Sequence, residues 1–120
     1  MYSFEINKTD KTMIAKVSGF FTEEEGKKYI TDFQNKVKTI DPSIFSLIVE
    51  GSKLSTTSSK AVEGLKNCIR FYMSNGFEKI ILVIPDSVTA KMQAQRVGTE
   101  VGFKGDYVTS IDEAISISKR

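Results

Sequence analysis

The chain has 120 residues, of which 40% are hydrophobic and 27% charged, and its formal net charge is +2. This composition is that of an ordinary globular protein, and the length fits a single domain over residues 1–120, because two separate cores would each bury too little surface. The small net charge, with lysines dispersed among acidic residues, argues against a nucleic-acid partner.

The N-terminal third predicts a β-hairpin followed by a helix. Apolar and polar residues alternate over residues 2–7, and the alternation resumes over residues 13–17 after a polar turn, which is typical of two paired strands. Thr22 and Glu25 then stand at the spacing of a capping box, which predicts the start of a helix that Asp41 and Pro42 end. Its apolar stripe falls at residues 29, 30, 33, 37 and 40.

Residues 44–65 are predicted to position the functional surface. The apolar run 44–49 is typical of a strand buried on both faces, and a run of hydroxyl side chains, residues 55–59, follows it. An amphipathic helix comes next, with its stripe over residues 62–72 and its end at Asn75 and Gly76. Because open α/β sheets usually bind ligands at the carboxyl ends of parallel strands, we expect a working site at this junction. Capping and a functional role are both compatible with the hydroxyl run.

The C-terminal half predicts two more strand and helix pairs. Residues 80–84 form the strongest buried-strand pattern, and Asp86 or Ser87 can cap a helix with its stripe at residues 90, 94, 97 and 101. A short strand at residues 107–109 precedes a second capping box, Ser110 with Glu113, and a final helix. We interpret Ser87, Thr109 and Ser110 as capping residues. The resulting order, ββαβαβαβα, predicts a single-domain α/β protein whose mixed sheet has its last three strands parallel.

The chain lacks the residues that several classes of function need. The chain has no histidine, which excludes Ser-His-Asp and Cys-His catalysis and most zinc sites. Its carboxylate pairs lie in the first turns of predicted helices, where the helix dipole explains them, and no phosphate-binding glycine motif is present. We interpret the single cysteine, Cys68, as a buried and inert thiol. We therefore expect no enzyme, no cofactor and no metal, and an enzyme that uses the hydroxyls with an external metal is the least favoured alternative.

The surroundings of the protein are also constrained by the sequence. No apolar stretch reaches the roughly 20 residues of a membrane helix, and Glu5 interrupts the segment where a signal peptide has its apolar core. We therefore expect a cytoplasmic protein without membrane contact. The sequence leaves its oligomeric state open.

Three short segments resemble the STAS domain, the SpoIIAA-like fold of bacterial anti-sigma factor antagonists. Residues 17–19 (VSG) are similar to the glycine-ended strand before the first helix of that family, Val49 and Glu50 to its central strand with an acidic tip, and residues 110–115 (SIDEAI) to its closing helix. The resemblance covers nearly the whole chain. It implies a mixed sheet with helices packed largely on one face, and a non-enzymatic regulatory or adaptor function in the bacterial cytoplasm.

The resemblance also implies a docking surface. In the antagonists the second serine of an Asp-Ser-Ser-Gly turn is phosphorylated by a partner kinase, and residues 57–60 of this chain read TSSK. Ser59 is the acceptor if the loop is one residue shorter than in the family, whereas the ungapped register places Lys60 there, and Ser58 is the second candidate acceptor. We expect a partner protein, a kinase-type anti-sigma factor or another regulator, to bind the loop 52–60 and the helix after it. The predicted partner-binding residues, expected to be exposed, are Ser58, Ser59, Lys60, Glu63 and Lys66.

One alternative function stays open. Related sheet-and-helix folds of the lipid-carrier kind enclose small apolar molecules, and such a function requires a cavity between the sheet and a helix.

Overall fold

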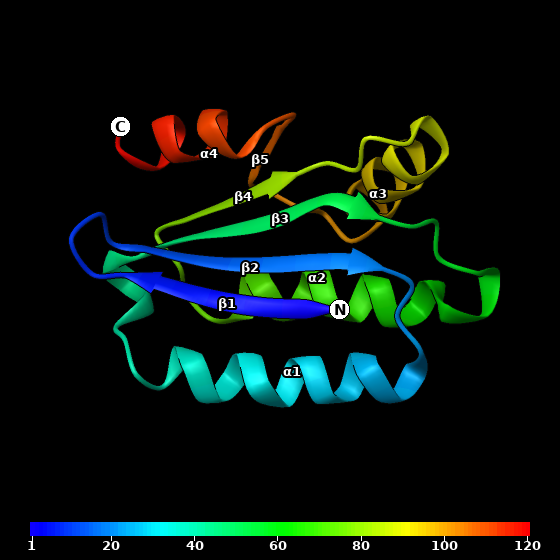
Figure 1. Ribbon diagram of the computed structural model, residues 1–120, viewed down its shortest axis with the longest axis horizontal. Helices are drawn as coiled ribbons and strands as arrows, with labels where there is room; N and C mark the ends of the chain where they lie inside the picture. Colours follow the sequence, from blue (N-terminus) through cyan, green and yellow to red (C-terminus); the bar gives the residue numbers. More distant parts are fainter.

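The computed structural model describes residues 1–120 and contains one five-stranded sheet with helices on both faces (Figure 1). The strands lie side by side in the order of the sequence, and the hairpin strands pair antiparallel while all later neighbours are parallel. The predicted fold class is confirmed, including the parallel arrangement of the last three strands. The strands are β1 (Tyr2–Asn7), β2 (Thr12–Gly19), β3 (Ser46–Leu54), β4 (Lys79–Val83) and β5 (Asp106–Val108).

Three of the four helices lie together, as the resemblance implied. The helices α1 and α2 cover one face of the sheet, α3 packs beside α2, and α4 packs alone against the opposite face. Right-handed crossovers between successive parallel strands place their helices on the same face, which accounts for this grouping. The helices are α1 (Glu23–Val37), α2 (Val62–Ser74), α3 (Val88–Glu100) and α4 (Ile111–Ser118).

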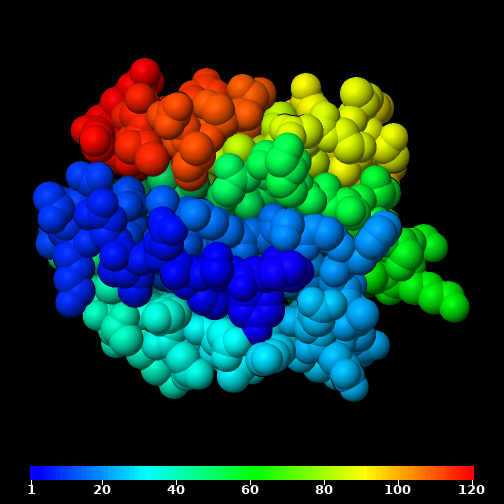
Figure 2. All heavy atoms as spheres, viewed as in Figure 1, coloured from blue at the N-terminus to red at the C-terminus, as the bar shows by residue number.

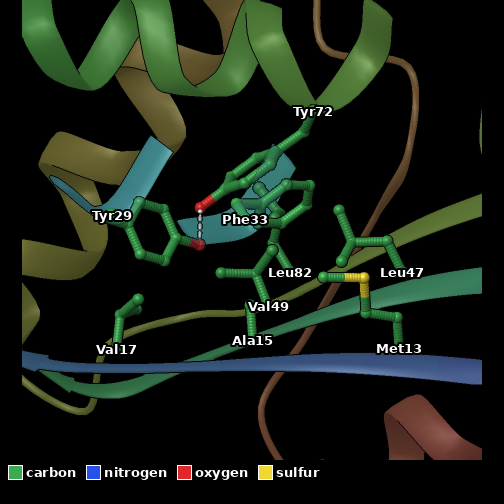
Figure 3. Packing of buried hydrophobic residues seen from close by; sticks show 9 residues of the cluster. All are labelled: Met13, Ala15, Val17, Tyr29, Phe33, Leu47, Val49, Tyr72 and Leu82. Carbon is green, nitrogen blue, oxygen red and sulfur yellow. Dashed lines mark hydrogen bonds between the residues drawn. The ribbon is translucent and has the colours of Figure 1, made fainter. Parts of the chain in front are cut away.

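The strands supply a core to each face because successive side chains point to opposite sides. In β4, Leu82 packs under α1 and α2, while Ile81 and Val83 pack under α4. Figure 3 shows the larger core, in which Phe33 of α1 and Tyr72 of α2 lie over apolar side chains from β2, β3 and β4. β3 contributes to both cores and has a paired strand on each side, so the predicted central strand is central in the sheet.

The helix starts follow the predicted capping residues. The hydroxyl oxygen of Thr22 accepts a hydrogen bond from the Glu25 amide at 3.1 Å, and that of Ser110 accepts one from the Glu113 amide at 3.1 Å. Ser87 accepts from the Ala90 amide at 3.4 Å, so it caps α3 as expected. These hydroxyls satisfy amide groups that the helix itself leaves without partners.

Both ends of the central strand and the end of the first helix differ from the prediction. The central strand begins at Ser46, because Asp41 caps a short 3-10 helix, Pro42–Ile44, that leaves Ile44 48% exposed. The strand also continues to Leu54, since β2 runs on to Gly19 and pairs with it to that point. Ser52, predicted to open the functional loop, therefore lies inside the strand. The first helix ends at Val37, and Ile40 packs against the core from outside it.

Candidate functional site

The segment that joins β3 to α2 projects from the carboxyl edge of the sheet. In Figure 1 it forms the outermost loop at the end of the parallel strands, and Figure 2 shows the same green segment, near residue 60, protruding from the body. Ser58, Ser59 and Lys60 are exposed, whereas residues 55–57 are half-buried. The hydroxyl run is therefore divided into a covered base and an exposed tip.

The base of the loop is held by hydrogen bonds of its main chain, one with another main-chain group and two with a side chain. The Ser55 amide donates to the Gly19 carbonyl at 3.1 Å, which extends the contact between β2 and β3 beyond the strand ends. The side-chain amide of Gln93, on α3, accepts from the Thr57 amide and donates to the Thr57 carbonyl, both at 2.7 Å. Both polar groups of the Thr57 backbone are therefore bound, and the exposed part of the loop begins at Ser58.

The exposed tip starts the following helix without a side-chain cap. Ser58 has the backbone conformation of an N-cap before the 3-10 helix Ser59–Ala61, yet its hydroxyl makes no capping hydrogen bond. Ala61 stands at the N-cap of α2, where it has no side chain that could accept one. This differs from the starts of α1, α3 and α4, where Thr22, Ser87 and Ser110 all bind an amide. The hydroxyls at the tip are thus not consumed by capping.

Two predicted partner-binding residues on α2 have different environments. Glu63 is exposed in the first turn. The Lys66 side chain is only 21% exposed, and its Nζ lies 2.9 Å from Glu100 Oε2 of α3 and 3.5 Å from Glu63 Oε1. The hydrogen bond between Lys66 and Glu100 raises the pKa of Lys66 and lowers that of Glu100. The expectation that Lys66 is exposed is wrong, because this side chain joins α2 to α3.

Exposed apolar side chains flank the loop. Phe20, which follows the end of β2, is 74% exposed, and Val88 and Met92, one turn apart on α3, are 70% and 65% exposed. Gly19 and Gln93, the chain neighbours of Phe20 and Met92, both hold the loop. Sequence reasoning missed these three residues, although Val88 and Met92 lie off the apolar stripe of their helix. We call Phe20, Ser58, Ser59, Lys60, Glu63, Val88 and Met92 together the loop-edge surface.

A groove of about 890 Å³ lies between α1 and α2, next to the loop. Its lining includes Val17 and Leu54 from the strand ends and Tyr29, Cys68, Phe71 and Tyr72 from the helices. Figure 3 shows the Tyr29 and Tyr72 hydroxyls pointing toward each other above Val17 and Val49, and the hydrogen bond that they share is 2.6 Å long. Burial raises the pKa of the Cys68 thiol to about 11, so the thiol is neutral near pH 7. The prediction of an inert thiol agrees with this chemistry, although Cys68 is half-buried at the groove.

The structure contains neither a membrane-spanning helix nor a cluster of metal-ligating side chains. None of its helices has the length and apolar character needed to cross a bilayer. No group of three or more histidine, cysteine or acidic side chains is arranged so that it could hold a metal ion.

Comparison with solved structures identifies the fold. No family model and no curated protein sequence matches the chain. A protein of the DUF3478 family with a SpoIIAA-like fold, from Shewanella loihica PV-4, is similar in structure, with a TM-score of 0.67 and 11% identity over 98% of this chain and 91% of its own. The anti-sigma factor antagonist SpoIIAA in its unphosphorylated form is similar with a TM-score of 0.66 and 17% identity, over 98% of this chain and 95% of its own. The chain therefore has a SpoIIAA-like fold, as the resemblance to the STAS domain implied.

Proposed function

We propose that this chain is a non-enzymatic regulatory domain of the bacterial cytoplasm that binds a partner protein through the loop-edge surface. The observation that carries the proposal is the exposed tip at Ser58, Ser59 and Lys60, which projects from the carboxyl edge with hydroxyls that no cap consumes. The similarity to SpoIIAA, described as an anti-sigma factor antagonist, supports a regulatory role. An anti-sigma factor of the kinase type, or another regulator, is the partner class that we favour.

The composition of the surface supports a protein partner. Phe20, Val88 and Met92 would bury apolar area on binding, while Lys60 and Glu63 supply charge beside them. Apolar and aromatic side chains next to polar and charged ones are typical of protein interfaces. Exposed apolar groups that gather around one loop are also less common on monomeric surfaces than scattered ones.

Ser59 and Ser58 are the proposed phosphoacceptors. A phosphoryl group at either position would add about −1.5 to −2 charges at neutral pH, close to Lys60 and to the uncapped start of α2. The positive end of the helix dipole favours that charge. A phosphorylated tip would therefore engage Lys60 internally, and the affinity of a partner that binds Lys60 through an acidic group would fall.

The proposal is tested by affinity purification from the native host with matched variants. We expect the joint variant S58A/S59A/K60A to lose the partner that the wild-type chain captures, with an unchanged circular dichroism spectrum. The control variant D112A/K119A changes exposed residues at the two ends of α4, on the opposite face of the sheet, and should retain the partner. Retention of the partner by the joint variant would reject the docking surface. Phosphopeptide mapping of the captured wild-type chain tests Ser58 and Ser59 separately.

A further inference from the structure

The groove between α1 and α2 contains two glycines whose side-chain positions are empty. Gly26 of α1 and Gly64 of α2 both line it, and a Cβ added at either residue would meet no atom within 4 Å. Residues three and four apart share a helix face, so Gly26 lies in line with Glu23 and Ile30, and Gly64 with Asn67 and Cys68, which all line the groove. Glycine within a helix costs about 1 kcal/mol relative to alanine. Neither residue has the positive φ that would require glycine. What the two glycines provide is the absence of side chains, which leaves the groove open.

The floor of the groove suits an apolar ligand. The Tyr29 and Tyr72 hydroxyls satisfy each other, and no buried side-chain nitrogen or oxygen of the protein is without a hydrogen-bond partner. Burial raises the pKa of both tyrosines well above the ordinary value, so the floor is uncharged near neutral pH. With Val17, Leu54 and Phe71 beside them, the deep part offers apolar contact and no unmet polar group. A volume of about 890 Å³ is within the range of small-molecule sites.

The charges that line the groove indicate the polar end of the ligand. Glu23 and Lys27 pair with each other at 3.5 Å on α1, and Glu63 pairs with Lys66 at 3.5 Å on α2. Lys60 is the remaining charged side chain of the lining, and it is exposed and forms no ion pair. The four charged side chains of the lining sum to zero, and Lys60, next to the loop, is the one among them that forms no ion pair.

We propose that this groove binds a free medium-chain fatty acid, with the hydrocarbon chain between α1 and α2 and the carboxylate at Lys60. An uncharged apolar trough open to solvent, with one unpaired ammonium group at its mouth, matches a single-chain monocarboxylate in both shape and charge. This site extends beyond the partner-binding function proposed above, and it is tested without any partner protein.

The test titrates the purified chain with laurate, lauryl alcohol and dodecylamine, each below its aggregation limit, and follows binding by calorimetry and native mass spectrometry. We expect saturable binding of one laurate, weaker binding of the alcohol and the weakest binding of the amine. The variant K60Q should lose about two- to fivefold in laurate affinity, the range of an exposed ion pair, and keep its affinity for the alcohol. Lys104, which is exposed and does not line the groove, supplies the matched control K104Q, which should leave both affinities unchanged.

A second pair of variants separates a filled groove from an unfolded protein. The double variant G26L/G64L places leucine side chains in the empty positions, and it should abolish laurate binding while its thermal midpoint is kept or raised. The control Q34L adds the same side chain to an exposed position of α1 outside the groove and should bind normally. Undiminished binding by a folded G26L/G64L variant, an absence of saturable laurate binding, or equal affinities for laurate and dodecylamine would each overturn the proposal. Binding seen only with phospholipid vesicles would overturn it as well.

Discussion

The Tyr29 and Tyr72 hydroxyls share a buried hydrogen bond inside the larger core (Figure 3). We predict that Y29F and Y72F each lower the free energy of unfolding by about 1 kcal/mol, because each leaves a buried hydroxyl without its partner. The double variant should cost less than the sum of the two, since it removes both polar groups together. Urea denaturation of the wild-type chain, the two single variants and the double variant measures this double-mutant cycle. The control Y107F, at a hydroxyl without a hydrogen bond in the structure, should change the free energy of unfolding by less than about 0.5 kcal/mol. If the losses in Y29F and Y72F add up in the double variant, the prediction is contradicted.

Lys66 has a structural role that distinguishes it from its neighbour Lys60. Its ammonium group bridges Glu63 and Glu100, and its side chain is mostly covered. We therefore predict that K66A lowers the urea midpoint while K60A, at an exposed residue without an ion pair, leaves it unchanged. E100Q should reproduce part of the loss, because it removes the partner carboxylate. Equal midpoints for K66A and K60A would show that the bridge between α2 and α3 does not stabilise the fold.

Residue roles that depend on local sequence could be predicted, and those that depend on tertiary contacts could not. Thr22 and Ser110 cap their helices as expected, because a cap binds an amide only three residues away. The exposed tip at Ser58 and Ser59 lies where the hydroxyl run indicated it. By contrast, the bond from Gln93 to Thr57 joins residues 36 apart, and no pattern near either residue indicates it. The covered position of Lys66 has the same cause, since its partner Glu100 belongs to another helix.

At the scale of the elements, the glycines occupy two kinds of position. Some stand beside open space, and others stand where another part of the backbone comes close. A Cβ at Gly64 of α2 would meet nothing, whereas one at Gly105, just before β5, would meet the carbonyl oxygen of Ile80 and the ring of Phe103. We predict that G64A raises the free energy of unfolding by about 0.5 to 1 kcal/mol, because alanine is the better helix former. G105A should lower it by about 1–3 kcal/mol, since a backbone atom must shift to admit the methyl group. Thermal and urea unfolding measure both, and equal signs for the two variants would contradict this account.

The elements themselves were predictable wherever one periodicity extended over a whole segment. The run at residues 80–84 and the stripe over residues 62–72 correspond to β4 and α2. The start of β3 was predicted two residues early because Ile44 continues the apolar run, and only the turn capped by Asp41 shows that this side chain leaves the sheet. The position of α4 on the opposite face had no local signal either. Its apolar stripe fits either face, and the choice depends on how the chain crosses after β5.

At the scale of the molecule, the groove and the loop-edge surface meet at two residues. Lys60 and Glu63 belong to the loop-edge surface and also line the groove, because the loop leads directly into α2. Two ligands that contact the same side chains must influence each other, and the coupling is reciprocal. We predict that saturating laurate lowers the affinity of the captured partner for the wild-type chain and has no effect on its affinity for G26L/G64L. Capture that is independent of laurate in both proteins would show that the two sites are uncoupled.

The pH dependence of stability is also a property of the whole chain. No histidine is present, so no side chain with an ordinary pKa between about 5 and 8 titrates, and we predict a flat stability profile over that interval. On the acid side, the hydrogen bonds from Ser43 lower the pKa of Asp41, and Lys66 lowers that of Glu100. A carboxyl group whose pKa is lower in the folded state stabilises the fold above its unfolded value. That stabilisation is lost as the pH falls below about 4.5.

The alkaline side follows from groups whose pKa is raised in the fold. Burial raises the pKa of Cys68 from 9.0 to about 11, and the hydrogen bond to Asp32 raises that of Tyr2 from 10.0 to about 12. The unfolded chain then releases these protons at a lower pH than the folded chain does, so stability is complete below pH 9 and declines as the pH rises toward 12. Tyr29 and Tyr72 act in the same direction, since burial raises the pKa of both. Urea midpoints measured across the pH range should therefore fall at both ends. C68A should remove the part of the alkaline loss that begins near pH 9, and an alkaline loss of the same size in C68A and in the wild-type chain would contradict this assignment.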